Sequence, residues 1–297
     1  MAEELGLTAA LDSALTRLRR SPIGGYHADG PAASEPIAWA AIALAHAGEP
    51  AAAQAGARWL AERQAGDGSV GVTAEQAEPA WTTALAILAW RAVDPVGYAQ
   101  PIASASDWAL DQEPWTQPPN PVLGHDLSLA GWSWAPDTHS WLEPTAFFAV
   151  ALRDGTLATH PRRVEAVRLL QDRLLPSGGA NYGNTVVFGQ ELLQHAQASG
   201  VAAWALAGER VDDPRLRLTL DYLADTIRQP LGAASVAWAV RGLAAHGLAG
   251  EDAAARLSAA WSRVGRDNGL YKPALFALAA QATLTHNRLP IRPVAAR

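Results

Sequence analysis

Two kinds of hydrophobic segment alternate along the whole chain. One kind has apolar residues every three to four positions, as in residues 8–19, where leucines recur on one helical face. The other kind is apolar at almost every position, as in the run IAWAAIALAHA. A helix that is apolar all round is buried, whereas a helix with a polar face lies outside it. The pattern therefore predicts an inner and an outer layer of helices.

Six cycles of outer helix, glycine-containing turn and inner helix follow one another. We predict outer helices over residues 8–19, 51–64, 101–111, 161–175, 214–228 and 252–264. The apolar helices begin near Pro36, Pro79, Pro144, Gly200, Ser235 and Pro273. A repeated helical hairpin forms an open solenoid or a closed ring, and a closed ring needs no capping repeats. Because neither end carries a polar cap, we predict an all-α (α/α)6 toroid, with residues 1–297 as one domain.

The glycine turns all join an outer helix to an inner helix, so they should lie at one end of the ring. Two long loops, at about residues 111–140 and 175–198, belong to the same end. Loops held on a rigid scaffold commonly carry function. We therefore expect the binding residues at this rim.

Tryptophan is unusually frequent, with 12 Trp against 4 Phe and 5 Tyr. The stretch GWSWAPDTHSW contributes Trp132, Trp134 and Trp141 to the rim, and Trp81 follows a comparable turn. Inner-helix positions that could face a central cavity hold Trp39, Trp81, Trp204 and Trp238. These rings fit a wall for an isoprenoid or its carbocation, a stacking platform for sugars, or packing between helices.

Glutamates precede proline at three expected inner-helix starts, at Glu35, Glu78 and Glu143. A carboxyl group in an apolar pocket has a raised pKa and can act as an acid or base. The alternative is that each one caps its helix or accepts hydrogen bonds from turn N–H groups. Glu143 has the most aromatic neighbours, so we take Glu143 and Asp137 as the candidate catalytic acids.

Other polar residues of the long loops are candidates for ligand contact. Asp137 and His139, or His125 and Asp126, could form an acid–base pair or a metal site, although they match no known ligand spacing and are more typical of solvated loops. Asn181 and Tyr182 could hydrogen-bond a ligand or simply form a turn. We predict no metal site.

Composition and charge exclude several classes of function. A net charge of −6 without a long basic cluster argues against a nucleic-acid partner. The absence of cysteine excludes disulfides, zinc–thiolate sites and a cysteine nucleophile. No apolar run approaches the ~20 residues of a membrane span, and the N-terminus has no signal-peptide core. No phosphate loop or dinucleotide fingerprint occurs. We therefore expect a cytoplasmic protein without a cofactor.

The turn from Gln64 to Val70 resembles the repeat of squalene–hopene cyclases and related prenyltransferases. That repeat has glutamine, three residues, glycine, one residue and tryptophan, and Val70 stands in the tryptophan position. GWSW before Ala135 and GANY before Gly183 look like its glycine–aromatic end without the glutamine. The resemblance implies six inner and six outer helices, often around an apolar cavity for isoprenoids.

Three departures from that family limit what the resemblance implies. The Asp-x-Asp-Asp motif of its class II cyclases is absent. Asp212 and Asp213 lack the third carboxylate of the magnesium motif, and the zinc site of protein prenyltransferases needs a cysteine. Three hypotheses stay open: an isoprenoid or other apolar small-molecule ligand, with terpene-cyclase-like chemistry by a non-standard acid; a carbohydrate-active toroid with two rim carboxylates; and a scaffold that binds a protein partner at the Trp-rich rim.

Overall fold

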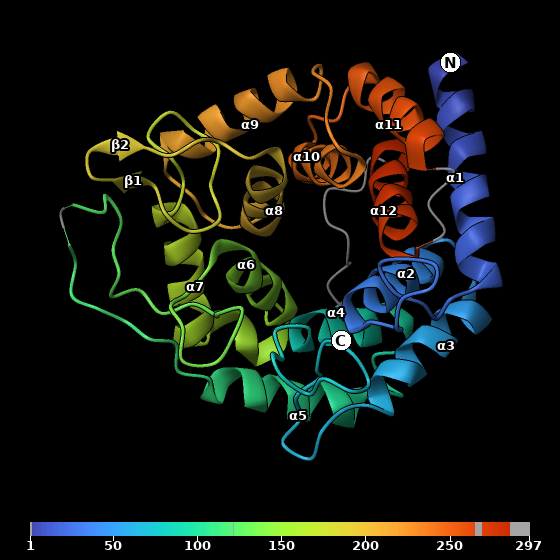
Figure 1. The fold of residues 1–297 in the computed structure, drawn as a ribbon, viewed down its shortest axis with the longest axis horizontal. Helices are drawn as coiled ribbons and strands as arrows, with labels where there is room; N and C mark the ends of the chain where they lie inside the picture. Colours follow the sequence, from blue (N-terminus) through green and yellow to red (C-terminus); the bar gives the residue numbers. More distant parts are fainter. Residues whose placement is uncertain (1, 121, 265–268, 286–297) are drawn as a thin grey trace.

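The chain forms a ring of helical hairpins, and the computed structural model describes residues 2–120, 122–264 and 269–285 (Figure 1). The inner helices are α2 (Ser34–His46), α4 (Thr83–Val93), α6 (Leu142–Ala151), α8 (Ala196–Leu206), α10 (Ala233–Ala245) and α12 (Tyr271–Thr285). The outer helices are α1 (Ala2–Arg20), α3 (Pro50–Ala61), α5 (Ala99–Asp111), α7 (Pro161–Asp172), α9 (Pro214–Thr226) and α11 (Glu251–Val264). The predicted (α/α)6 toroid is confirmed.

The ring is closed by contact between its first and last hairpins. Each inner helix packs against the next one along the chain, and α12 packs against α2. The first outer helix, α1, also packs against α11 and α12. Closure leaves no end of the array exposed, in agreement with the absence of capping repeats.

The two layers differ in burial as the hydrophobic pattern requires. All ten residues of α6 are buried, including Glu143 and Thr145. In the outer helix α3, by contrast, only one face is buried, through residues such as Ala57 and Leu60. Apolar sequence on every face therefore marks the inner helices, because a solvated helix would expose that surface to water.

Two glycine turns pack closely against the next outer helix. Gly68 has a φ of +97°, and a Cβ there would lie 2.2 Å from the backbone oxygen of Ser104 in α5. Gly178 repeats this arrangement against Leu218 in α9, with a φ of +84°. Gln64, the glutamine of the repeat-like turn, donates from Nε2 to the carbonyls of Gly68 and Pro101, both at 2.9 Å. This side chain thus ties its own turn to the following hairpin.

One inner helix begins later than the sequence predicts. Glu78 and Pro79 do not open α4, which starts at Thr83. The reason is that Thr82 and Thr83 bond to the backbone of Val70 through their hydroxyls, which keeps the preceding residues in the turn. Glu78 is consequently an exposed loop residue.

Short irregular elements lie in the connections between helices. Residues Val186–Val187 and Gln190–Glu191 form a small antiparallel hairpin, β1 and β2, in the second long loop, and Gly155–Thr159 forms the 3-10 helix η1. The helical periodicity gave no sign of the strands. None of the helices in the described part of the chain combines the length and apolarity needed to cross a bilayer.

Candidate functional site

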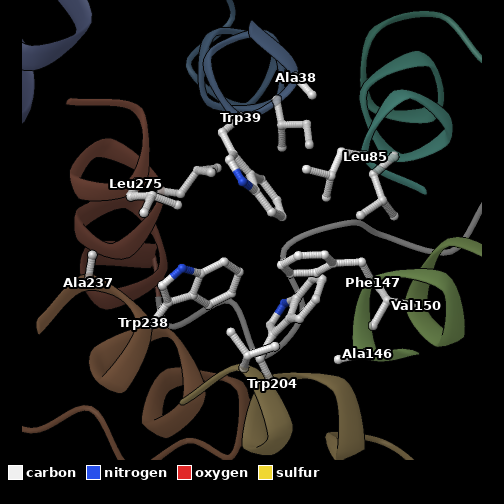
Figure 2. Close-up of a cluster of buried hydrophobic side chains, with 14 of the residues drawn as sticks. Ala38, Trp39, Leu85, Ala146, Phe147, Val150, Trp204, Ala237, Trp238 and Leu275 are labelled. Carbon is white, nitrogen blue, oxygen red and sulfur yellow. The ribbon is translucent and has the colours of Figure 1, made fainter. Parts of the chain in front are cut away.

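Four aromatic side chains meet at the centre of the inner ring, and we call them the aromatic box: Trp39, Phe147, Trp204 and Trp238 (Figure 2). The Trp39 ring centroid lies 5.4 Å from that of Trp238 and 5.8 Å from that of Phe147, both in edge-to-face contact. Trp204 joins them at 5.6–6.4 Å. Each is at most 2% exposed, so these rings fill the space between the inner helices at this level.

The repeat explains how three of these rings come together. Trp39, Phe147 and Trp238 each stand five residues after the first residue of their helix, in α2, α6 and α10. Equivalent positions in a ring of hairpins lie at equal depth, so the three side chains converge on one level. Trp39, Trp204 and Trp238 point into the ring, as expected, but their rings pack against one another at its centre. Trp81 lies before α4 and lines the rim pocket instead. Trp90 of α4 points outward and donates its indole N–H to the Ala57 carbonyl of α3 at 2.9 Å.

A glycine pair brings the helices of Trp204 and Trp238 into close contact. A Cβ on Gly200 in α8 would lie 2.3 Å from the Trp238 carbonyl oxygen, and one on Gly242 in α10 would lie 2.8 Å from the Gly200 oxygen. Only glycine permits this approach. The pair thereby sets the separation of two walls of the aromatic box.

A guanidinium group sits against the same rings. Arg241 in α10 is 2% exposed, and its Cζ lies 4.5, 4.9 and 5.3 Å from the ring centroids of Trp238, Trp39 and Trp204. Burial lowers the pKa of Arg241 to about 9. The sequence interpretation missed this residue, although it is the single charged residue of the segment AASVAWAVRGLAA.

Glu35 is a buried carboxyl near the N-terminal end of α2. It accepts hydrogen bonds from the Tyr26 hydroxyl and, at 3.4 Å, from the Trp39 indole N–H, and Tyr271 also bonds to it. Burial raises its pKa to about 7, although these hydrogen bonds act in the opposite direction. Its partners come from the first and last hairpins, so ring closure assembles this group.

Glu143 occupies the corresponding position of α6. It is 6% exposed, and Gln197 at the start of α8 donates to it at 3.2 Å. Burial raises the pKa of Glu143 to about 7, the bond from Gln197 lowers it, and the charge of Glu35 raises it further. The hydrogen bonds given for Glu35 and Glu143 come from side chains and not from backbone N–H groups at the starts of α2 and α6. These contacts give the capping interpretation no support at either residue.

The third glutamate and the second candidate acid lie elsewhere. Glu78 and Asp137 are exposed and line a rim pocket of about 220 Å³ together with Trp81 and Trp134. These two rings meet edge to face at 4.6 Å. Asp137 has a φ of +57°, in the left-handed region, and is not grouped with Glu143. The structure thus separates a central group of carboxyls from a rim group.

The tryptophans of the aromatic loop, residues 131–141, differ in burial and therefore in role. Trp132 is 2% exposed, donates its indole N–H to the Ala109 carbonyl at 2.9 Å and stacks on Phe148 at 4.9 Å, so its main role is packing. Trp141 is half-buried, with its ring 4.5 Å from that of His139. Because Trp132 is buried, it cannot belong to an exposed surface that binds a protein partner at the rim. Binding of a protein partner stays a prediction.

A second pocket of about 240 Å³ lies between the long loops, lined by His125, His139, Arg173 and apolar residues. Burial, and then the charge of Arg173, lowers the pKa of both histidines. Within the described residues, no hydrogen bond or ion pair joins His139 to Asp137, and His125 bonds to Leu123 and Thr185 instead of to Asp126. No cluster of three or more metal-ligating side chains occurs there either. Neither histidine–aspartate pair of the loop is therefore formed as an acid–base pair.

Asn181 and Tyr182 hold the second long loop together. Asn181 donates to the Leu193 carbonyl at 2.7 Å, while the Tyr182 backbone oxygen accepts from the Leu142 N–H at 3.0 Å. The Tyr182 side chain is exposed, with its ring 4.8 Å from that of His195. The turn interpretation accounts for these contacts, and a ligand contact stays a prediction.

No protein-family profile matches the sequence, and no curated protein resembles it significantly. Solved structures do resemble the fold. A variant of the type II terpene cyclase MstE from Scytonema, in complex with geranylgeranyl dihydroxybenzoate, is 15% identical with a TM-score of 0.67, covering 96% of this chain and 99% of that one. A protein from Actinoplanes is 15% identical with a TM-score of 0.64, covering 94% and 99%.

Glycosidases share the architecture as well. A GH8 xylobiose complex from Teredinibacter turnerae is 12% identical with a TM-score of 0.57, covering 97% of this chain and 95% of that one. Such identities establish fold and leave activity open. The expected membership of the squalene–hopene cyclase group stays a prediction. The chain has the (α/α)6 toroid fold found in both a type II terpene cyclase and a GH8 glycosidase.

Proposed function

We propose that the protein binds an isoprenoid, or a ligand of comparable apolarity, between the N-terminal ends of its inner helices and against the aromatic box. The proposal rests on one observation: two buried carboxyls, Glu35 and Glu143, lie above a box made almost wholly of aromatic carbon. Trp faces attract positive charge as well as apolar surface. The fold likeness to a terpene cyclase agrees with this choice, as an analogy.

The buried carboxyls give the site a proton donor. With a pKa of about 7, Glu143 is substantially protonated at neutral pH, unlike an ordinary glutamic acid. A proton passed from Glu143, or from Glu35, to a double bond or oxygen of the ligand leaves positive charge on the ligand. The rings of Trp39 and Trp238 would then stabilise that charge. This is terpene-cyclase-like chemistry with a non-standard acid.

Binding and chemistry can be tested separately. Native mass spectrometry of freshly purified protein should reveal a retained apolar ligand, and geranylgeraniol should quench the intrinsic Trp fluorescence. Trp238→Leu should weaken that binding at least tenfold. Trp261→Leu serves as the control, because Trp261 packs on Phe276 from the outer helix α11. Absence of a retained ligand, together with absence of any geranylgeraniol binding, would refute the proposal.

The proton donor has its own experiment. Glu143→Gln keeps a group that can bond to Gln197 but holds no acidic proton. It should therefore bind a prenyl substrate normally and give no cyclised product by mass-coupled chromatography. A product yield equal to that of the wild type would remove Glu143 from the catalytic role.

The rim pocket supports a second candidate function, carbohydrate binding. Trp81, Trp132 and Trp134 line it together with the carboxylates of Asp67, Glu78, Glu113 and Asp137. Aromatic faces with nearby carboxylates suit sugar rings and their hydroxyl groups. Titration with xylotetraose tests this candidate: binding that Trp134→Ala abolishes would favour it, and no heat or fluorescence change at millimolar sugar would exclude it.

A further inference from the structure

Arg241 differs from the other buried arginines of the described chain in lacking hydrogen-bond partners. Arg163 donates to the carbonyls of Ala149 and Ala158 and pairs with Glu209, and Arg173 likewise has an aspartate and a carbonyl. Neither terminal nitrogen of Arg241 has a partner. Buried charges in proteins are normally paired, because desolvating a guanidinium is costly.

Among the described residues, no group around Arg241 supplies an anion: burial raises the pKa of its neighbour Tyr271, so that phenol stays neutral. Three tryptophan faces contact it, and these contribute cation–π attraction only. Of the two buried carboxyls, Glu35 bonds to Tyr26, Trp39 and Tyr271, and Glu143 bonds to Gln197. None of the described side chains therefore supplies an anion to the Arg241 donors, which leaves them available for a group on a bound ligand.

We propose that Arg241 binds an anionic head group, a carboxylate or a phosphate, on the apolar ligand of the toroid. This inference rests on the proposed function and names the class of ligand: an amphiphile with a long apolar chain and an acidic end. The two free guanidinium nitrogens match the paired oxygens of either group, which accept parallel hydrogen bonds from arginine.

The position of Arg241 sets the direction in which such a ligand would lie. Glu35 is the second residue of α2, and Arg241 is the ninth residue of α10. In a ring whose inner helices start at the same level, the Cα of Arg241 therefore lies roughly 10 Å further along the helix axis, at about 1.5 Å per residue. The acidic end would thus be held deep in the ring, and the apolar chain would run past the aromatic box toward the carboxyls.

A bound anion also resolves a conflict in the proposed chemistry. A guanidinium within 5.3 Å of three box rings would repel positive charge that forms on a ligand in the same place. An anionic head group neutralises that guanidinium. The tryptophan faces then become available to stabilise charge on the chain of the ligand.

The test compares three probes with the same C20 chain: geranylgeraniol, geranylgeranoic acid and geranylgeranyl diphosphate. At pH 8 the two acids are ionised. We expect wild type to bind at least one of them tenfold or more tightly than the alcohol, since hydrogen bonds to charged groups are worth about that much. Because Arg241 is 2% exposed, the head group reaches it only when the rings move, so Trp fluorescence reports the binding.

Variants separate the charge of Arg241 from general effects. Arg241→Met should remove the preference for the acid and leave the alcohol affinity within twofold, while Arg241→Lys should keep part of the preference. Arg217→Met removes a charge from an exposed helix face and should change neither affinity. If Arg241→Met does not fold, the comparison of acid with alcohol in wild type and in Arg241→Lys still decides the question.

The outcomes distinguish this inference from the function on which it rests. Equal affinity of wild type for the acids and the alcohol would overturn the role of Arg241 and leave apolar binding in place. An unchanged preference in Arg241→Met would do the same. Failure of all three probes to bind would overturn both. Whichever acid is preferred identifies the head group as carboxylate or phosphate.

Discussion

Replacing Glu143 by glutamine should make the protein more stable, and by an amount that grows with pH. The pKa of Glu143 is about 7 in the folded chain and 4.5 as its ordinary value. A carboxyl whose pKa is raised on folding stabilises the folded state below the unfolded pKa, and that contribution is lost as pH rises through the folded pKa. Wild type therefore loses stability between about pH 4.5 and 7, and Glu143→Gln lacks this loss.

The magnitude follows from the two pKa values. A difference of about 2.5 pH units, at about 1.36 kcal/mol each, gives about 3 kcal/mol. No reduction for solvent screening is needed because Glu143 is 6% exposed. The quantity to plot is the free energy of unfolding of Glu143→Gln minus that of wild type, from urea titrations between pH 4 and 8. It should rise by about 3 kcal/mol and level off above about pH 8.

Glu78→Gln is the matched control for this measurement. Glu78 also precedes a proline, but its side chain is exposed, so the same substitution should change the free energy of unfolding by less than about 0.5 kcal/mol. A difference curve for Glu143→Gln that is flat across pH would show that Glu143 is solvated, and it would remove the physical basis for its role as a proton donor.

Two further predictions concern packing. Gly242→Ala should destabilise the protein by about 1–3 kcal/mol in urea unfolding, since its Cβ would meet the Gly200 backbone. Gly6→Ala, in an open position of α1, should instead stabilise it by about 0.5–1 kcal/mol, and equal effects at both sites would contradict the close approach of α8 and α10. Trp132→Ala should cost about 3–5 kcal/mol, because its ring is buried. Trp134→Ala should lower the free energy of unfolding much less and should instead weaken ligand binding in the rim pocket. A larger loss of stability for Trp134→Ala than for Trp132→Ala would contradict these roles.

The hydrophobic pattern was sufficient to predict the architecture. Segments that are apolar all round can only be inner helices, and their alternation with amphipathic segments fixes both the layers and the order. The turns are expected at one end of the ring because each of them joins an outer helix to the following inner helix. The starts of individual helices are predicted less accurately. Glu78 and Pro79 look like the start of a helix, but hydroxyl bonds from Thr82 and Thr83 hold the chain in a turn there.

The candidate site was predicted only in part, because its assembly depends on depth in the ring. Glu35, Glu143 and the inner tryptophans were identified from recurrence along the sequence. Whether a carboxyl is solvated was not readable, so Glu78 looked equivalent to the other two. Arg241 and Tyr271 were missed because their importance comes from neighbours on other hairpins. The one feature of the sequence that indicates Arg241 is that it is the single charged residue of an otherwise apolar helix.

The place where the ring joins its own ends has a consequence for how the protein can be regulated or damaged. Leu270 donates its N–H to the Gly25 carbonyl at 2.8 Å, and the Tyr26 and Tyr271 rings lie 5.3 Å apart. Glu35 sits at that seam, with partners separated by almost the full length of the chain. Separation of the first and last hairpins would expose this carboxyl to water and lower its pKa toward that of an ordinary glutamate. The pKa of Glu35 therefore reports whether the ring is closed.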